Sequence, residues 1–418
     1  MFQFIKNEFE YIKAQTGWMA FLIATSVIFT ILGPLPFIPW FHFPFLAMAA
    51  VYCVYKGGRR ETSMLLLLMY IPLSILIDTP DAVFRSWQRF LVFVLVVLFA
   101  SPLIQNEYAV TLRKQVLFMY LGYCTVIAIG SFVCYFLGIN YMRNQSDGSV
   151  INYIDSAGGF GGLTRQSMVL GPISGMATLY MFYRYFQSEQ ENKKWYIIAM
   201  LFCFVTVLLS SSRSALTATI VGSILILYQS KQNFGRFVKA LLGFGIIVAL
   251  ILSIWGGATA GLAKKQAANE KLGQYGSRTE KWEARMAEFG SSPLTGVGFC
   301  AQDPNGNDYY NRITGVVEPG SSWLAILSMT GLIGFILFCN LIRKPLMILS
   351  HERTYDDILV FSLLIFFCVH MIAEGYIFSG GSIFCFLTWL IIGCAYDAYI
   401  WSQNELGEAL NTNIDSDL

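Results

Sequence analysis

Charged residues are scarce in this chain. Lys and Arg total 28 and Asp and Glu total 26 among 418 residues, so only 13% of the chain is charged. A soluble domain carries about 25% charged residues, and a soluble enzyme is therefore excluded. The net charge is only +2 and no basic block is present, which argues against nucleic acid as a partner.

Histidine and cysteine form no cluster either. The three histidines are scattered, and no His or Cys group has the spacing of a metal site. Of the nine cysteines, only Cys300 falls in a segment predicted to lie outside the apolar stretches, so no internal disulfide framework is expected. We therefore expect no metal and no cofactor.

Long apolar stretches are present instead. Hydrophobic residues make up 56% of the chain, and the mean hydropathy is +0.56. A helix needs about 20 apolar residues to cross a bilayer, and about twelve such stretches occur. They lie at residues 17–33, 36–55, 62–78, 87–105, 115–138, 167–187, 195–211, 214–230, 237–261, 321–342, 355–375 and 378–400. The sequence predicts an all-α polytopic membrane protein with about twelve transmembrane helices.

The distribution of Lys and Arg predicts the orientation. Most of these residues fall in alternate short connections, which places both termini in the cytoplasm. The two long outside segments are the expected places of function. The predicted segments are a cytoplasmic interfacial helix (1–16), transmembrane helices 1–9 (17–261, with an outside loop at 139–166), a large helical outside loop (262–320), transmembrane helices 10–12 (321–400) and a mobile cytoplasmic tail (401–418).

Arg213 lies at an unusual place for a charge. It follows three serines at the junction of two apolar stretches, which places it near the outer boundary of the membrane. A charge at that depth needs an anion or a water-filled cavity. The alternative is a side chain that extends to the lipid headgroups. We expect an anion-binding residue.

The large outside loop contains further arginines. Its sequence from Ser277 to Glu280 has the pattern of a capping box, which predicts a helix that starts at Ser277 and ends near residue 289. At about 100° per residue, one face of this helix carries arginines and aromatics. That face consists of Arg278, Trp282, Arg285 and Phe289, and the opposite face of Glu280, Glu283 and Ala287. The two arginines are candidate anion ligands, unless their stems pack and their charged ends reach water.

A glycine-rich run from Ala157 to Arg165 precedes the stretch at 167–187. It lacks the Lys-Ser/Thr pair of a P-loop, so it is not expected to bind a nucleotide. We expect a flexible hinge or lid, with Arg165 as a further candidate contact to phosphate.

His370 and Glu374 are four residues apart and share one face of a predicted membrane helix. A carboxylate in such a helix indicates function by default. Because Glu374 is near the end of the stretch, the alternative is a residue at the membrane interface. Both residues are candidates for the site.

The sequence combines several candidate anion-binding arginines with no metal-binding pattern. This combination fits a lipid pyrophosphate as the substrate. A guanidinium group can donate two parallel hydrogen bonds to two oxygens of a lipid pyrophosphate. Pyrophosphate is also a good leaving group where its charge is stabilised. A transferase of this kind needs fixed cations and one base that accepts a proton from the attacking hydroxyl.

Three motifs between residues 205 and 340 resemble those of the O-antigen ligase/polymerase superfamily. They are the serine-rich turn with Arg213; Arg278 and Trp282 followed by Pro-Leu-Thr-Gly-Val-Gly-Phe at 293–299; and Glu318-Pro-Gly320 followed by Gly-Leu-Ile-Gly at 331–334.

This resemblance implies a metal-independent, inverting glycosyltransferase of GT-C-like architecture. It would act on undecaprenyl-pyrophosphate-linked oligosaccharides at the periplasmic face of the bacterial inner membrane. Arg213 and Arg278 match arginines that the family associates with pyrophosphate and catalysis. Where ligases typically have His, this chain has Gly320, which favours the polymerase branch and leaves Glu318 and Glu374 as candidates for the base.

The leading hypothesis is therefore a Wzy-type polymerase, which transfers the growing glycan to the non-reducing end of another lipid-linked repeat unit. The alternatives are a ligase that transfers the glycan to lipid A core, and a transporter without bond chemistry. The expected partners are the lipid bilayer and a chain-length regulator protein. Aromatic side chains expected either to stack on sugars or to pack against the helices are Trp282, Trp323, Tyr309 and Tyr310.

Overall fold

The computed structural model describes residues 10–12, 17–36, 38, 40–78, 82–142, 159–188, 192–229, 267, 278–301, 319–347 and 355–416. Predictions that concern the stretch at 237–261, Tyr309, Tyr310 and Glu318 lie outside these residues, as does most of the predicted interfacial helix at 1–16.

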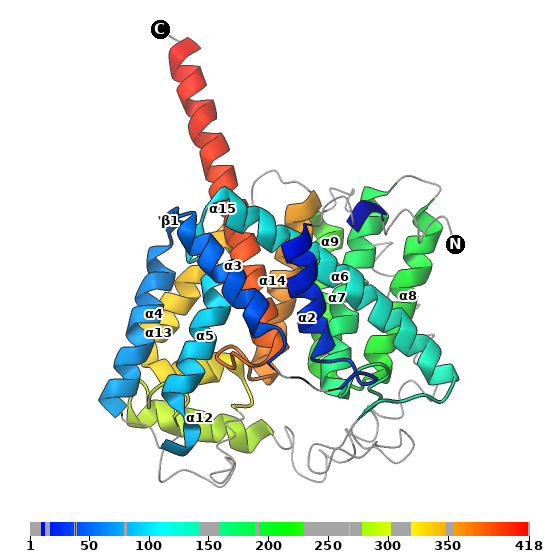
Figure 1. Ribbon diagram of the computed structural model, residues 1–418, viewed down its shortest axis with the longest axis horizontal. Helices are drawn as coiled ribbons and strands as arrows, with labels where there is room; N and C mark the ends of the chain where they lie inside the picture. Colours follow the sequence, from blue (N-terminus) through cyan, green and yellow to red (C-terminus); the bar gives the residue numbers. More distant parts are fainter. Residues whose placement is uncertain are drawn as a thin grey trace. The chain divides into compact units, whose positions relative to one another are not determined.

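The described parts of the chain are mainly α-helical (Figure 1). The longer helices are α2 (Trp18–Phe29), α3 (Phe43–Tyr55), α4 (Thr62–Asp78), α5 (Ser86–Ala100), α6 (Glu107–Phe136), α7 (Ser167–Gln187), α8 (Lys193–Leu209), α9 (Arg213–Gln229), α12 (Thr279–Ser291), α13 (Ser322–Leu346), α14 (Tyr355–Ala373) and α15 (Ile383–Ser416). The short elements are the 3-10 helix η1 (Ala82–Phe84) and two antiparallel strands, β1 (Arg59–Arg60) and β2 (Ile104–Gln105).

The apolar stretches that fall on described residues overlap these helices, although α6 begins eight residues before the stretch predicted at 115–138. The stretches at 62–78 and 167–187 have the bounds of α4 and α7, respectively. Four helical segments within the described residues are long and apolar enough to cross a membrane, namely Glu107–Phe136, Ser322–Leu346, Asp356–Ala373 and Ile383–Ile400, and several shorter apolar helices accompany them. The chain is thus a helical membrane protein.

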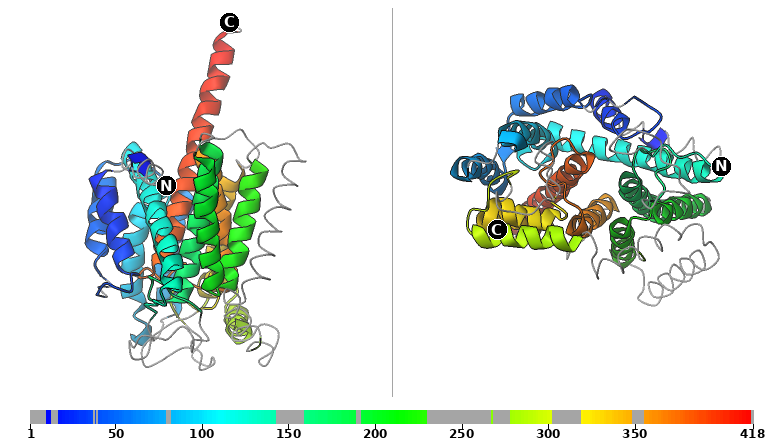
Figure 2. Two further views of the ribbon diagram at one scale, coloured as in Figure 1. Left: turned by 90° about the vertical axis from the view of Figure 1, so that its right-hand side faces the viewer. Right: turned by 90° about the horizontal axis from the view of Figure 1, so that it is seen from below.

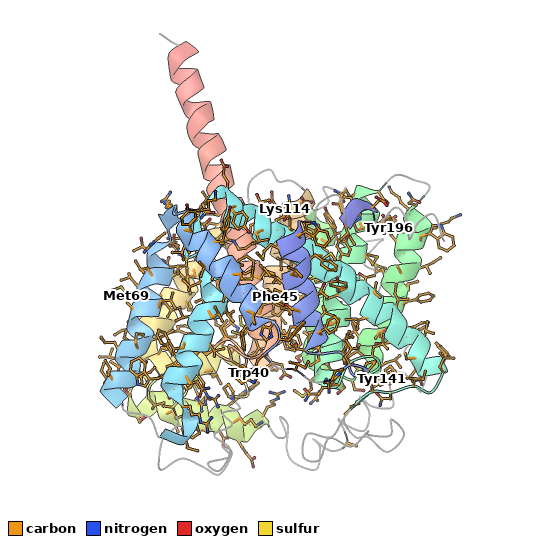
Figure 3. All side chains as sticks on the ribbon, viewed as in Figure 1. Trp40, Phe45, Met69, Lys114, Tyr141 and Tyr196 are labelled. Carbon is orange, nitrogen blue, oxygen red and sulfur yellow. The ribbon has the colours of Figure 1, made fainter. Side chains whose placement is uncertain are left out.

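The surface of α4 supports this assignment. Large apolar side chains recur along one side of the helix at helical spacing and are exposed. They are Leu66, Met69, Leu73, Leu76 and Ile77. Met69 is 63% exposed and projects away from the helix (Figure 3). An exposed apolar stripe of this length is expected to face lipid.

The chain divides into two compact units. Unit 1 comprises Met1–Phe45, Gln115–Lys281 and Ile365–Glu374, and unit 2 comprises Leu46–Lys114, Trp282–Leu364 and Gly375–Leu418. In unit 1, α7 packs against α8 and α9, as the end-on view in Figure 2 shows. In unit 2, α13 packs against α4 and α15, and α15 packs against α5.

Two features differ from the sequence-based expectations. The tail predicted to be mobile continues α15 as a helix to Ser416. Arg113, which lies in a short connection that the charge distribution predicts to be cytoplasmic, is part of α6 and is fully buried in unit 2, where its Nε and Nη2 donate to the two carboxylate oxygens of Asp397 at 2.8 and 2.7 Å. The sequence did not reveal this pair because its members lie far apart in the chain.

Candidate functional site

The serine-rich motif forms the turn between α8 and α9 in unit 1. Ser211 has a φ of 57°, which reverses the chain after α8. The side chain of Ser212 then accepts from the backbone N–H of Ala215 at 3.4 Å, which is the pattern of a helix N-cap. As a result, α9 begins at Arg213, whose side chain is exposed.

The described part of the glycine-rich run packs against this turn, and its role as a flexible hinge or lid stays a prediction. In the part that the structure describes, Phe160 donates its backbone N–H to the carbonyl of Leu209 at 3.1 Å. Leu163 donates to the hydroxyl of Ser131 at 3.0 Å. Phe160 is 2% exposed. Glycine is useful here because it permits close backbone approach, which the sequence alone does not distinguish from flexibility.

Arg165 is also engaged in this packing. Its backbone N–H donates to the carbonyl of Ile31 at 3.1 Å, and its guanidinium donates to the carbonyl of Leu35. These bonds connect the glycine-rich run with the segment that follows α2. They support a positioning role, and a contact of Arg165 with phosphate stays a prediction.

Arg278 and the serine-rich turn meet at one carboxylate in unit 1. Arg278 Nη2 donates to Glu374 Oε1 at 2.6 Å. The hydroxyl of Ser214 donates to the same oxygen at 3.5 Å. Ser214 Oγ is in turn 3.4 Å from the hydroxyl oxygen of Ser212. The structure thus brings together two motifs that are far apart in the sequence.

The groups that surround the Glu374 carboxylate attract negative charge. Glu374 follows the last residue of α14 and contacts the first turn of α9, where the helix dipole attracts negative charge. The side chain of Arg278 is 23% exposed and that of Glu374 is 17% exposed. The two side chains of this pair are therefore only partly buried.

His370 lies one turn before Glu374 and is buried. Its ring stacks on that of Phe366, with an interplanar angle of 11° and 5.9 Å between centroids. This stacking accounts for the burial of His370 without a ligand. The contact of His370 with substrate stays a prediction.

Arg285 has a different environment in unit 2. Helix α12 exposes Glu280, Glu283 and Ala287 and buries Arg285, as the helical pattern predicts. Arg285 Nη1 is 3.0 Å from Glu288 Oε2 and 3.1 Å from Ser328 Oγ. Burial lowers the pKa of Arg285, although Glu288 acts in the opposite direction. The i, i+3 spacing to Glu288 is the signal in the sequence that indicates this pair.

The Pro-Leu-Thr-Gly-Val-Gly-Phe motif closes a break in α13. Helix α13 is interrupted at Gly331, so backbone groups on both sides of the break lose their partners within the helix. The motif supplies new partners: Leu332 N–H donates to Pro293 O (2.9 Å), Ile333 N–H to Leu294 O (3.4 Å), Val297 N–H to Ser328 O (2.8 Å) and Gly298 N–H to Met329 O (3.1 Å). A broken membrane helix is tolerated where protein groups restore these bonds.

Two glycines make this pairing possible. Gly331 has a φ of 62°, and a Cβ atom there would lie 2.3 Å from Leu294 O. Gly296 has a φ of 76°, and its Cβ would lie 2.5 Å from the backbone of Met329. The motif at 293–299 and the Gly-Leu-Ile-Gly motif at 331–334 therefore pair with each other, and we call this paired structure the joint.

Aromatic packing anchors the same joint in unit 2. The ring of Phe299, the last residue of the motif, is 5.9 Å from Phe93 and 5.3 Å from Phe378. Trp323 packs at 5.5 Å against Phe338 across the break. Trp323 thus packs against the helix, which was one of the two expected roles. Stacking of Trp323 on a sugar stays a prediction.

Trp282 fixes the segment that contains Gly320. Its indole Nε1 donates to the Gly320 carbonyl at 3.3 Å. Gly320 has a φ of 71°, a conformation that costs a residue with a Cβ about 1–2 kcal/mol. The replacement of the ligase histidine by glycine is therefore accompanied by a backbone that disfavours other residues.

Cys300 follows the joint and is buried, contrary to its predicted location in an exposed loop. Together with Arg89 and Pro319 it lines a cavity of about 20 Å³, which is room for one water molecule. Burial raises the pKa of the Cys300 thiol to about 12.

These features define a multi-pass helical membrane protein with a partly exposed arginine–carboxylate centre at its helix ends. Residues 198–339 match the family model described as O-antigen ligase, and the predicted resemblance to the O-antigen ligase/polymerase superfamily is thereby confirmed. No curated protein matches the chain. The match includes Arg213, Arg278 and both halves of the α13 joint, whereas Glu374 lies beyond it. Members of this family are glycosyltransferase-like enzymes, which supports an enzyme role for the chain in this broad sense.

Proposed function

We propose that the chain is a polysaccharide polymerase of the bacterial inner membrane. It transfers a growing glycan from undecaprenyl pyrophosphate to the non-reducing end of a second lipid-linked repeat unit. In this proposal about twelve helices span the membrane in a GT-C-like arrangement, both termini are cytoplasmic and the site faces the periplasm.

One observation carries the proposal. The serine-rich turn and Arg278 both donate to the same oxygen of Glu374, in a chain whose residues 198–339 match the O-antigen ligase family. A centre that holds one carboxylate with a guanidinium, a hydroxyl and a helix N-terminus has the donors that a lipid pyrophosphate needs. Arg213, at the start of α9, adds a second guanidinium.

The proposed reaction is metal-independent and inverts the anomeric carbon. The acceptor hydroxyl attacks this carbon while the bond to the pyrophosphate oxygen breaks. Arg213 and Arg278 stabilise the negative charge that develops on the leaving group. A base accepts the proton of the attacking hydroxyl.

An O-antigen ligase is the second candidate, because the matching family model carries that description. It would use the same donor and transfer the glycan to lipid A core. Gly320 argues against it, since it lacks the imidazole that ligases typically have at this position.

The test uses purified protein in liposomes with a defined lipid-linked repeat unit. We expect the wild type to produce a ladder of lipid-linked polymers and Arg213→Ala and Arg278→Ala each to lose it. Arg343→Ala is a matched control, because Arg343 is an exposed arginine in the last turn of α13 and belongs to neither motif. This variant should retain the ladder.

The alternatives give different products. A ligase extends lipid A core and forms no ladder on undecaprenyl pyrophosphate, whereas a transporter returns the substrate unmodified. A full ladder from both arginine variants would contradict the assignment of the site.

A further inference from the structure

The anion that the arginine–carboxylate centre of unit 1 holds is a side chain of the protein itself, Glu374. Glu374 Oε1 accepts from Arg278 and from Ser214, which are the donors proposed to receive the diphosphate of the substrate. A carboxylate is planar and presents two oxygens to a guanidinium, much as two phosphate oxygens do. Glu374 therefore occupies part of the place that the diphosphate needs.

We infer that Glu374 is exchanged for the diphosphate of the lipid-linked donor and, once released from Arg278, becomes the general base of the transfer. This inference rests on the proposed function and deepens it, because the base is otherwise unassigned.

The exchange is physically favourable. Partly exposed ion pairs contribute little net stability, and the Arg278–Glu374 pair is of this kind. A diphosphate carries more negative charge than a carboxylate and offers more oxygens to Arg278. The bound donor also repels a carboxylate that remains beside it. The donor therefore displaces Glu374 from the guanidinium.

The position of Glu374 allows it to stay near the reacting atoms after the exchange. It follows the end of α14 and contacts Ser214 in the first turn of α9, next to Arg213. A carboxylate held by a guanidinium is a poor proton acceptor, and release from the guanidinium makes it a better one. Binding of the donor thus both fills the anion site and activates the base.

The proton and electrons balance in this step. The acceptor hydroxyl oxygen forms a bond to the anomeric carbon, and its proton passes to the Glu374 carboxylate. The bond between the anomeric carbon and the pyrophosphate oxygen breaks, and its electron pair leaves with the pyrophosphate held by Arg278. Glu374 later returns the proton to solvent when the product leaves.

The decisive variant is Glu374→Gln, which removes the charge and keeps the shape. Binding of undecaprenyl pyrophosphate, measured by calorimetry in detergent, should tighten several-fold because the internal competitor is weakened. Turnover with the lipid-linked repeat unit should fall by about 10²–10⁴-fold because the base is lost. In Glu374→Ala, added formate should restore part of the turnover.

Glu283→Gln is the matched control, since Glu283 is an exposed glutamate on α12, and it should change neither quantity. A purely structural ion pair predicts the opposite binding result, namely weaker binding in Glu374→Gln because Arg278 loses its support. Weaker binding, or turnover within a few-fold of the wild type, would overturn the inference. Failure of the wild type itself to form polymer would instead refute the proposed function.

Discussion

Two arginine–carboxylate pairs in this protein have nearly equal bond lengths and opposite surroundings. In unit 2, Arg113 lies 2.7 Å from Asp397 and is 0% exposed, and its Nη1 also donates to the backbone carbonyls of Phe99, Ser101 and Ile104. In unit 1, Arg278 lies 2.6 Å from Glu374, and both side chains are partly exposed.

The difference shows which arginine is available for a ligand. The donors of Arg113 are directed at fixed acceptors inside the protein, so any exchange leaves a buried charge without compensation. The Arg278 pair is accessible to solvent and shares its acceptor oxygen with a serine hydroxyl. Burial, and not the distance within the pair, separates the enclosed pair of Arg113 from the partly exposed pair of Arg278.

The largest effect on stability is expected for Arg113→Ala. The substitution leaves the Asp397 carboxylate buried without its cation, which costs about 3–5 kcal/mol. Thermal unfolding of the purified protein in detergent should show a markedly lower midpoint. The double variant Arg113→Met/Asp397→Leu should recover much of the loss, because both charges are then removed. A single variant as stable as the wild type would contradict the structural role.

Arg278→Lys should affect activity and leave stability nearly unchanged. Lysine keeps the charge but loses the planar fork, so we expect the transfer rate to fall by about 10²-fold, as for loss of one catalytic donor. The free energy of unfolding should change by less than about 1 kcal/mol, since the pair is partly exposed. A large drop in the unfolding midpoint would place Arg278 in the same class as Arg113.

Gly331→Ala should weaken the joint in unit 2. The substitution introduces a Cβ at a positive φ and 2.3 Å from a carbonyl oxygen, which is expected to cost about 1–3 kcal/mol. Gly290→Ala is the control, because nothing lies within 4 Å of its Cβ position in α12, and it should stabilise the protein by about 0.5–1 kcal/mol. Equal unfolding midpoints for the two variants would contradict the role of the joint.

The smallest effect concerns the reactivity of Cys300. Because burial raises its thiol pKa to about 12, little thiolate forms at neutral pH. We expect no modification of Cys300 by a maleimide in the folded protein and full modification after denaturation, as measured by peptide mass spectrometry. A cysteine introduced by Glu283→Cys should react in the folded state. Fast labelling of Cys300 would show that the segment after the joint opens.

The sequence predicted the helices well, because a membrane helix is defined by a local property. An apolar stretch of about 20 residues must satisfy its backbone groups within itself, so its bounds follow from composition. The stretches that became α4 and α7 illustrate this. The amphipathic pattern of α12 was equally readable, since its exposed and buried faces follow from the helical repeat.

The sequence predicted less about the roles of particular residues. The glycine-rich run was expected to be flexible, and its described part is a packed support for the serine-rich turn. Arg285 was expected to contact substrate and is enclosed with Glu288. In both cases the partners decide the role. The glycine-rich run contacts residues that are distant in the chain and leave no periodic signal in the sequence, whereas the Glu288 partner of Arg285 is three residues away.

The sequence by itself determined that this chain is a helical membrane protein and which arginines belong to family motifs. Only the tertiary structure decided that Arg278 meets Glu374 beside the start of α9, that Arg113 is enclosed with Asp397, and that two glycine motifs complete each other at a broken helix. The physical reason is that hydrophobicity acts on each segment separately, whereas the charge state and accessibility of a side chain depend on what folding places around it.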